Sequence, residues 1–142
     1  FPYTTLFRSP ILPLTWWWEF FYENGANSEF ASVARFEDLM TTEGANQLER
    51  VGFETPRNIE ARGLRNSKTI FAWLRQTGKT GQEGDAIIGD VKPGKYQLKW
   101  YDTREGRFYE RGHLTVTGNS GLILPLNRLK ENKDVALKIE RL

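Results

Sequence analysis

The chain has 142 residues, a length typical of one domain with a modest hydrophobic core, and it contains no cysteine, which excludes disulfides, iron–sulfur clusters and thiolate zinc sites. Its 20 lysines and arginines nearly balance 18 aspartates and glutamates, whereas a nucleic-acid-binding surface needs a clustered basic excess, so no nucleic-acid partner is expected. No apolar run approaches the roughly 20 residues of a membrane span, so no membrane partner is expected either.

The first nine residues, Phe1–Ser9, read FPYTTLFRS. They resemble the in-frame translation of a sequencing-adapter oligonucleotide, and such a segment is excluded from reasoning about the fold. The alternative is an ordinary aromatic N-terminal tail. With the adapter reading, we expect the natural chain to start near Pro10 as a fragment of a longer protein, so the lack of a visible targeting segment carries no information.

Residues 10–45 are expected to form one strand–helix unit. A buried strand is predicted from about Leu14, and it includes the aromatic run Thr15–Phe21, TWWWEFF. A polar loop follows over residues 23–27, and Asn27 or Ser28 can cap a helix over residues 28–43. Apolar side chains at helical spacing predict one broad buried face, made of Phe30, Val33, Phe36, Leu39 and Met40.

Residues 46–55 are predicted to be a connector, and the pattern from Pro56 to residue 142 changes to short segments with a period of two. Turn residues separate these segments, as in Lys92-Pro93-Gly94. Seven strands are predicted, over residues 58–62, 69–76, 85–91, 95–102, 107–117, 121–126 and 135–141. The predicted fold class is therefore mainly β, a seven-stranded antiparallel β-sandwich preceded by one strand–helix unit.

The order of an aromatic strand, a helix and a β-sandwich resembles the C-terminal end of bacterial (β/α)8-barrel glycoside hydrolases of the large retaining clan, of the family-five type. Residues 92–108, KPGKYQLKWYDTREGRF, also resemble a β-domain that follows some such barrels and is classed as collagen-binding. The resemblance implies that residues 10–45 are the last strand and helix of a truncated barrel. It also implies a secreted or periplasmic parent that acts on polysaccharide.

The same resemblance implies a substrate-binding role for Trp16, Trp17, Trp18 and Glu19, because active sites of these barrels lie at the C-terminal ends of the strands. An aromatic ring suits the apolar face of a pyranose. Trp16 and Trp18 would share one face of the strand and Trp17 the other; which of them faces the sugar stays open, as does the alternative that all three are core residues. The two catalytic carboxylates of the family come from earlier strands, so no catalytic residue is assigned here and the chain itself is expected to be inactive.

Other candidate residues have plainer explanations. Asp85 and Asp90 lack the spacing of a cation loop, so no metal site is expected. His113 has no partner in reach by sequence, and the glycines of the segment 78–84 lack the ending of a phosphate loop. No cofactor is expected. A group of strand aromatics could form a sugar-binding platform, but core positions are the more common role for such residues: Trp73, Trp100, Tyr101, Phe108 and Tyr109.

Two further functions for the β-domain stay open besides its place at the end of a hydrolase. It could be a non-catalytic carbohydrate- or matrix-binding module, which requires Trp73 or Trp100 to be exposed. It could instead brace the barrel by intramolecular packing and bind nothing else.

Overall fold

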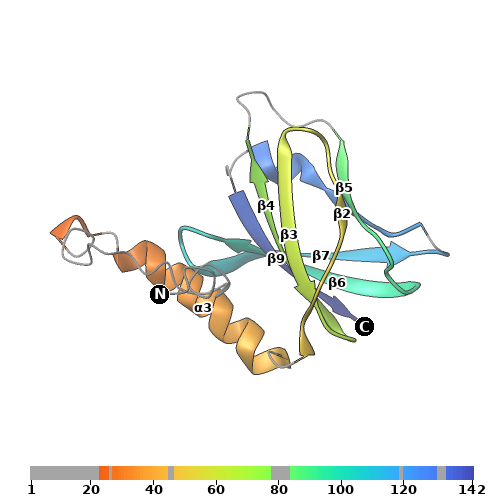
Figure 1. Cartoon of the computed structure of the whole chain (residues 1–142), viewed down its shortest axis with the longest axis horizontal. Coiled ribbons are helices and arrows are strands. Elements are labelled where there is room, and N and C mark those ends of the chain that lie inside the picture. Colours follow the sequence, from red (N-terminus) through yellow and green to blue (C-terminus); the bar gives the residue numbers. More distant parts are fainter. Residues whose placement is uncertain (1–22, 26, 45–46, 78–83, 119, 131–133) are drawn as a thin grey trace, which may run out of the picture.

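The computed structural model describes residues 23–25, 27–44, 47–77, 84–118, 120–130 and 134–142. The protein is mainly β, with two antiparallel sheets and one long helix among these residues, which confirms the mainly β, antiparallel character of the predicted class (Figure 1). No helix in this part of the chain is both long and apolar enough to cross a membrane.

The larger sheet has six strands. In spatial order they are β1 (Glu49–Arg50), β3 (Ile59–Arg65), β4 (Thr69–Gln76), β9 (Asp134–Arg141), β6 (Gly94–Asp102) and β7 (Arg107–Val116). The smaller sheet consists of β2 (Phe53–Glu54), β5 (Asp85–Ile88) and β8 (Leu122–Pro125). The sequence predicted β4 with its observed ends, whereas β3 runs three residues further than expected and β5 stops three residues earlier.

The hydrophobic core lies between the two sheets. Alternate residues of β9 point inward, namely Val135, Leu137 and Ile139, and all three are fully buried. Leu122 and Leu124 of β8 meet them from the smaller sheet. Tyr96, at the start of β6, is buried in the same core and its hydroxyl donates to the carbonyl oxygen of Lys92 at 2.6 Å. Immunoglobulin-type sandwiches contain a similar tyrosine corner, in which a hydroxyl bonds to backbone just upstream.

The segment expected to be a connector contains two short strands that the sequence did not predict. Strand β1 pairs with β3 in the larger sheet, and β2 pairs with β5 in the smaller one, so the chain passes from one sheet to the other at Val51 and Gly52. The crossing lies directly over Gly63 of β3, where an added Cβ would come within 2.9 Å of Val51 and Phe53 side-chain atoms. The described residues therefore contain nine strands where seven were expected.

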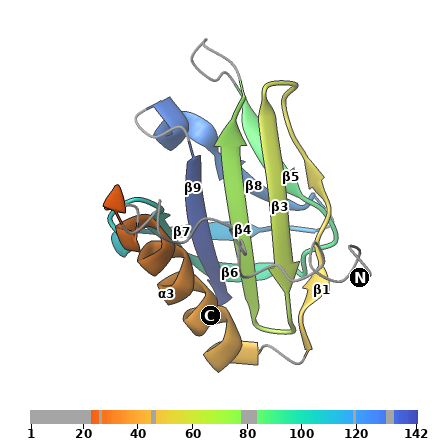
Figure 2. The same cartoon turned by 60° about the vertical axis from the view of Figure 1, so that its left-hand side comes forward.

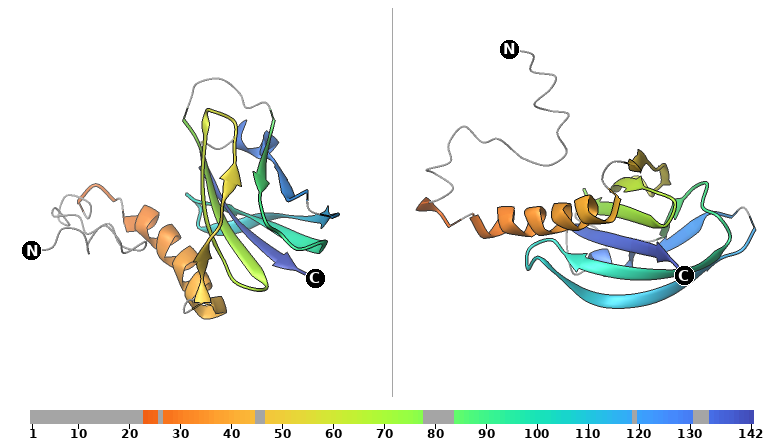
Figure 3. Two further views of the ribbon diagram at one scale, coloured as in Figure 1. Left: turned by 45° about the vertical axis from the view of Figure 1, so that its right-hand side comes forward. Right: turned by 90° about the horizontal axis from the view of Figure 1, so that it is seen from below.

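Helix α3 (Asn27–Gly44) lies on the outer face of the six-stranded sheet, beside β9 (Figure 2). The two further views show the same placement, with the helix on the side away from the smaller sheet (Figure 3). A short 3-10 helix, η2 (Leu126–Lys130), follows β8. The long helix matches the predicted one within a residue at each end.

The predicted buried face of this helix needs one correction. Phe36 packs on the sheet as expected, but Val33 is 49% exposed, whereas Ser32 is only 2% exposed. Ser32 and Phe36 are four residues apart and lie on the same side of the helix, whereas Val33 is rotated from Ser32 by about 100°. Polar contacts to the sheet thus turn the helix away from the orientation that its apolar residues alone predict.

Candidate functional site

The predicted substrate-binding residues Trp16, Trp17, Trp18 and Glu19 lie outside the described residues. Their assignment stays a prediction, as does the assignment of residues 1–9 to an adapter. Within the described part of the chain, buried polar chemistry is concentrated between α3 and the outer face of the six-stranded sheet. We call this surface the helix-docking face.

The helix-docking face is made by the residues that alternate with the core positions of three strands. Its members are Thr69, Phe71 and Trp73 of β4, Gln97, Lys99 and Tyr101 of β6, and Ala136, Lys138 and Glu140 of β9. These side chains point away from the core, yet Phe71, Tyr101 and Lys138 are each no more than 5% exposed. A solvent-facing sheet surface would leave such residues open, so the helix accounts for their burial.

The first set of contacts joins the N-terminal half of α3 to the turn between β6 and β7. The Oγ of Ser32 donates to the carbonyl oxygen of Thr103 at 2.5 Å, and the Tyr101 hydroxyl donates to the carbonyl oxygen of Ser32 at 2.8 Å. Both side chains are buried, and each polar group has a partner, as burial requires. The two bonds fix the helix both along and around its axis.

The shape of this turn allows the close approach. The Oδ1 of Asp102 accepts the backbone N–H groups of Arg104 and Glu105, both at 2.9 Å, and the Gly106 N–H donates to the Asp102 carbonyl oxygen. Gly106 has a φ of +67°, which favours glycine, and an added Cβ would lie 3.2 Å from the Cα of Ser32. The turn Asp102–Gly106 (DTREG) therefore leaves room for the helix backbone to pack against it.

An aromatic cluster forms the middle of the interface. The Phe36 ring of α3 lies 4.9 Å from the Tyr101 ring and meets the Phe71 ring edge-on at 6.0 Å. Phe108 of β7 packs edge-on against the other side of Tyr101 at 5.1 Å and is 37% exposed. Such pairs add roughly 0.5–1.5 kcal/mol beyond their burial, so this cluster stabilises the docked helix.

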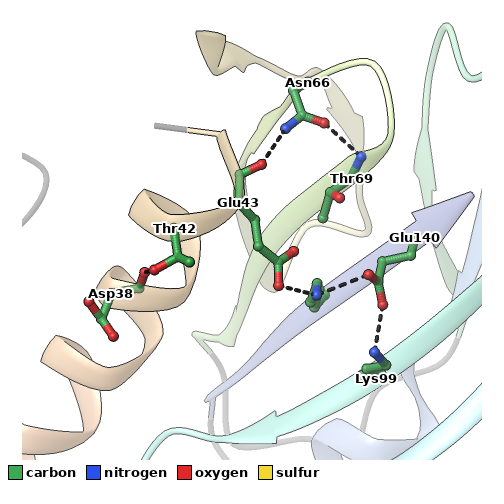
Figure 4. Close-up of polar contacts among 8 residues, drawn as sticks. Asp38, Thr42, Glu43, Asn66, Thr69, Lys99 and Glu140 are labelled. Atoms are coloured by element: carbon green, nitrogen blue, oxygen red, sulfur yellow. Dashed lines mark hydrogen bonds and ion pairs between the residues drawn. The ribbon is translucent and has the colours of Figure 1, made fainter. Parts of the chain in front are cut away.

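A chain of charges closes the C-terminal end of the interface. Lys138, only 5% exposed, binds Glu43 of α3 at 2.5 Å and Glu140 at 3.0 Å, and Glu140 in turn binds Lys99 at 2.6 Å (Figure 4). The helix also receives a hydrogen bond from Asn66, whose Nδ2 donates to the Glu43 carbonyl oxygen at 3.1 Å. Because the last carbonyl groups of a helix lack partners within the helix, this bond supports its end.

The charges of this cluster shift the pKa values of two members. Burial acts on Lys138 most strongly and opposes its protonation, but hydrogen bonds from its ammonium group to Glu43 and Glu140 together outweigh burial and raise its pKa above 10.5. The hydrogen bond from Lys99 is the main cause that lowers the pKa of Glu140 below 4.5; burial opposes this, and Lys138 adds to it. Both groups are charged at neutral pH.

A second polar cluster ties the edge of the sheet to the loop after β5. Arg65 binds Glu49 and Asp90, each at 3.0 Å, and these hydrogen bonds raise the pKa of Arg65, with Asp90 as the larger cause. Two shallow surface hollows of about 330 and 420 Å³ lie beside the turn between β3 and β4. The ion-paired Glu49, Arg65 and Asp90 line the first hollow, and Glu43 and Glu140, which pair with Lys138, line the second.

The weaker sequence candidates do not come together into a site. No group of three or more metal-ligating side chains occurs among the residues that the structure describes. Asp85 and His113 are exposed on different sheets, and Asp90 accepts hydrogen bonds from Arg65 through its backbone and side chain. Of the three loop glycines, only Gly84 falls within the described residues.

The strand aromatics do not line up as one exposed platform. Trp100 is 3% exposed, on the core side of β6, and Tyr101 is buried under the helix. Trp73 is half-buried on the outer face, and its Nε1 donates to Asp134 at 3.3 Å. Phe108 and Tyr109 are 37% and 42% exposed. The carbohydrate- or matrix-binding alternative requires an exposed Trp73 or Trp100, and because Trp100 is buried it depends on Trp73 alone.

Sequence reasoning missed the residues that hold the helix. Lys138 alternates with core residues on β9, a pattern typical of a solvated strand face, and nothing in its own segment indicates a covering helix. Ser32 has a weak signal, since it lies one helical turn before Phe36 and so on the same side.

No family model and no curated protein sequence matches this chain.

Proposed function

We propose that this chain is the C-terminal part of a bacterial (β/α)8-barrel glycoside hydrolase of the retaining clan, secreted or periplasmic, and that its β-domain braces the last barrel helix, α3. The observation that carries the bracing role is the three-part docking of α3 on the sheet, by Ser32 and Tyr101, by Phe36, and by Glu43 with Lys138. The barrel assignment is carried by the residue pattern of the aromatic strand.

The proposal gives the β-domain no catalytic role. A retaining glycosidase needs a proton-donating carboxyl and a nucleophilic carboxylate about 5 Å apart. Glu43 and Glu140 both bind Lys138 and so form the obvious carboxylate pair of the helix-docking face. However, Lys99 and Lys138 lower the pKa of Glu140, so this carboxylate stays ionised at neutral pH and has no proton to donate, and the pair is closed off by two lysines. This pair is therefore suited to holding the helix.

Substrate contact in this proposal belongs to the parent barrel. Trp16, Trp17, Trp18 and Glu19 would form one wall of its sugar-binding cleft, with an aromatic ring stacked on a pyranose and Glu19 as a contact or supporting residue. Carbohydrate is thus a partner of the parent enzyme, and the β-domain makes intramolecular contacts with the barrel.

The first test is to clone the source gene and read the coding sequence upstream of Pro10. We expect earlier barrel strands and two glutamates at strand ends, with hydrolysis of a polysaccharide by the full-length protein and none by the 142-residue chain. An upstream reading frame without barrel strands would contradict the proposal.

A second test separates bracing from substrate binding in the full-length enzyme. Tyr101→Phe removes the hydroxyl that binds the Ser32 carbonyl, at a cost of about 1 kcal/mol. We expect faster thermal inactivation with kcat and KM unchanged at low temperature. A change in KM with unchanged inactivation would argue against a brace.

The alternative, a carbohydrate- or matrix-binding module, is supported by one observation, the half-buried Trp73 on the outer sheet face. Affinity electrophoresis of the 142-residue chain in gels that contain soluble polysaccharides tests it directly. Retardation that Trp73→Ala abolishes would favour binding, and unchanged mobility in every polysaccharide would leave bracing as the role.

A further inference from the structure

The pair Asn24–Gly25 places a reactive side-chain amide next to an unhindered backbone nitrogen. Asn24 is the only asparagine of the chain that a glycine follows. Because glycine has no Cβ, nothing on the following residue obstructs the approach of its backbone nitrogen to the Cγ of the asparagine. These two atoms can therefore join into a cyclic imide more easily at Asn24 than at any other asparagine of this sequence.

The structure leaves room for this ring closure. Asn24 and Gly25 lie in a turn just before helix α3, and both residues are exposed. Gly25 has a φ of +68°, and an added Cβ there would meet no atom within 4 Å. A peptide unit in an exposed turn rotates more readily than one in the middle of a helix or strand, so the nitrogen of Gly25 can turn toward the side chain of Asn24.

Asn66, in the turn between β3 and β4, has the opposite environment in the same chain. Its Nδ2 donates to the carbonyl oxygen of Glu43 at 3.1 Å (Figure 4). Its Oδ1 accepts the backbone N–H groups of Lys68 and Thr69 at 2.9 and 2.8 Å. Ring closure at Asn66 would first have to break these three hydrogen bonds, so the docking of α3 protects this amide.

We propose that Asn24 is a site of spontaneous deamidation, in which the backbone nitrogen of Gly25 attacks the Cγ of Asn24. The bond from nitrogen to Cγ forms while the bond from Cγ to Nδ2 breaks, and the amide proton of Gly25 leaves with the side-chain amide as ammonia. Water then opens the cyclic imide. Attack of water on the backbone carbonyl carbon gives isoaspartate, and attack on the side-chain carbonyl carbon gives aspartate, without any change of oxidation state.

The modification does not require the protein to unfold. It replaces a neutral amide by a carboxylate shortly before the N-terminus of α3, where negative charge is favourable. The contacts that hold the helix on the sheet begin further along the chain, at Ser32. The folded protein should therefore accumulate the modified forms. This inference does not depend on the proposed function, because the chemistry is the same whatever the parent protein does.

Incubation of the 142-residue chain at mildly alkaline pH tests the proposal. Peptide mass spectrometry follows the conversion of Asn24 and of Asn66 to acids, once in native buffer and once in urea, and fragmentation of the peptides distinguishes isoaspartate from aspartate. The variant Asn24→Gln is the matched control, because its longer side chain closes a less favourable ring and leaves the turn otherwise unchanged.

In native buffer we expect conversion at Asn24 to be at least about tenfold faster than at Asn66, because Asn66 reacts only after its hydrogen bonds open. Isoaspartate should be among the products, and the Asn24→Gln variant should lack the fast conversion. In urea the rate at Asn66 should rise while the rate at Asn24 changes little.

Three results would overturn the proposal. The first is an Asn24 that persists in native buffer but reacts in urea, which would mean that the folded turn prevents ring closure. The second is a native rate at Asn24 no higher than that at Asn66. The third is formation of aspartate without isoaspartate, which would show direct hydrolysis of the amide and no cyclic imide.

Discussion

Lys138 is the residue whose environment departs most from what its position in the sequence indicates. It alternates with core residues on β9 and would face water on an uncovered sheet, yet it is almost fully buried between Glu43 and Glu140. A buried ammonium group costs free energy unless carboxylates and hydrogen bonds compensate it. The two glutamates therefore decide whether the C-terminal end of α3 stays on the sheet.

Loss of a carboxylate and loss of the ammonium group should both weaken the cluster. Glu140→Gln weakens the pairing of both Lys99 and Lys138, so we expect a loss of about 1–3 kcal/mol in the free energy of unfolding in urea. Lys138→Met breaks both ion pairs of Lys138 and leaves Glu43 and Glu140 without the ammonium group between them, so we expect a loss at least as large. Glu60→Gln, an exposed change on β3, is the control. A Lys138→Met variant as stable as the native chain would contradict this account.

The pH dependence of stability follows from the same cluster. The folded-state pKa of Glu140 lies below its ordinary value of 4.5, so its contribution is complete above that pH and is lost as the pH falls through the folded-state pKa. For Lys138, whose pKa is raised above 10.5, the contribution is complete below 10.5 and is lost at higher pH.

Urea unfolding of the native chain and of Glu140→Gln between pH 2 and 8 checks the acid side. We expect a constant stability difference from about pH 5 upward that shrinks at lower pH. A difference that grows as the pH falls would contradict the assignment.

Residue-level prediction failed wherever a contact depends on an element far away in the chain. Ser32 and Thr103 are 71 residues apart, and Glu43 and Lys138 are 95 apart. No local periodicity encodes such pairs. The close approach of Gly106 to Ser32 likewise follows from the tertiary fold.

At the scale of elements, the strands with long alternating patterns were predicted well. Strand β4 has its predicted ends, and β9 starts one residue early, because each has a continuous apolar side that meets the core. Strands β1 and β2 were missed because each has only two residues, too few for a period to show. For α3, the sequence predicted that Val33 lies on the buried face. The hydrogen bonds of Ser32 instead orient the helix so that Val33 points outward.

The crossing of β1 and β2 over the sheet depends on Gly63. An added Cβ there would lie 2.7 Å from the Phe71 carbonyl oxygen and 2.8 Å from the Val51 Cγ1. We expect Gly63→Ala to lower the free energy of unfolding by about 1–3 kcal/mol because backbone or core atoms must shift.

Gly112→Ala on β7 is the matched control, since an added Cβ there meets no atom within 4 Å. It should be neutral or slightly stabilising, as alanine costs less backbone entropy than glycine in a strand. Equal destabilisation by both changes would show that the crossing does not constrain Gly63.

At the scale of the whole molecule, the account treats the β-sandwich as a support for one helix. Most of the stability of a helix in a protein comes from tertiary packing, so α3 depends on the sheet. The sandwich has its own core between the two sheets, whereas the contacts of the helix that the described residues show join it to the outer face of the larger sheet. Loss of those contacts should release the helix and leave the sheets folded.

Native-state hydrogen exchange of the 142-residue chain tests this claim most directly. We expect the backbone amides of α3 from Ala34 to Met40 to be protected nearly as strongly as those of β9, and to lose about fivefold of that protection in Tyr101→Phe, in line with a cost of about 1 kcal/mol, while β9 keeps its own. Helix amides that exchange as fast as those of an isolated peptide in the native chain, or that are unaffected by Tyr101→Phe, would contradict the role of the sheet as a support for α3.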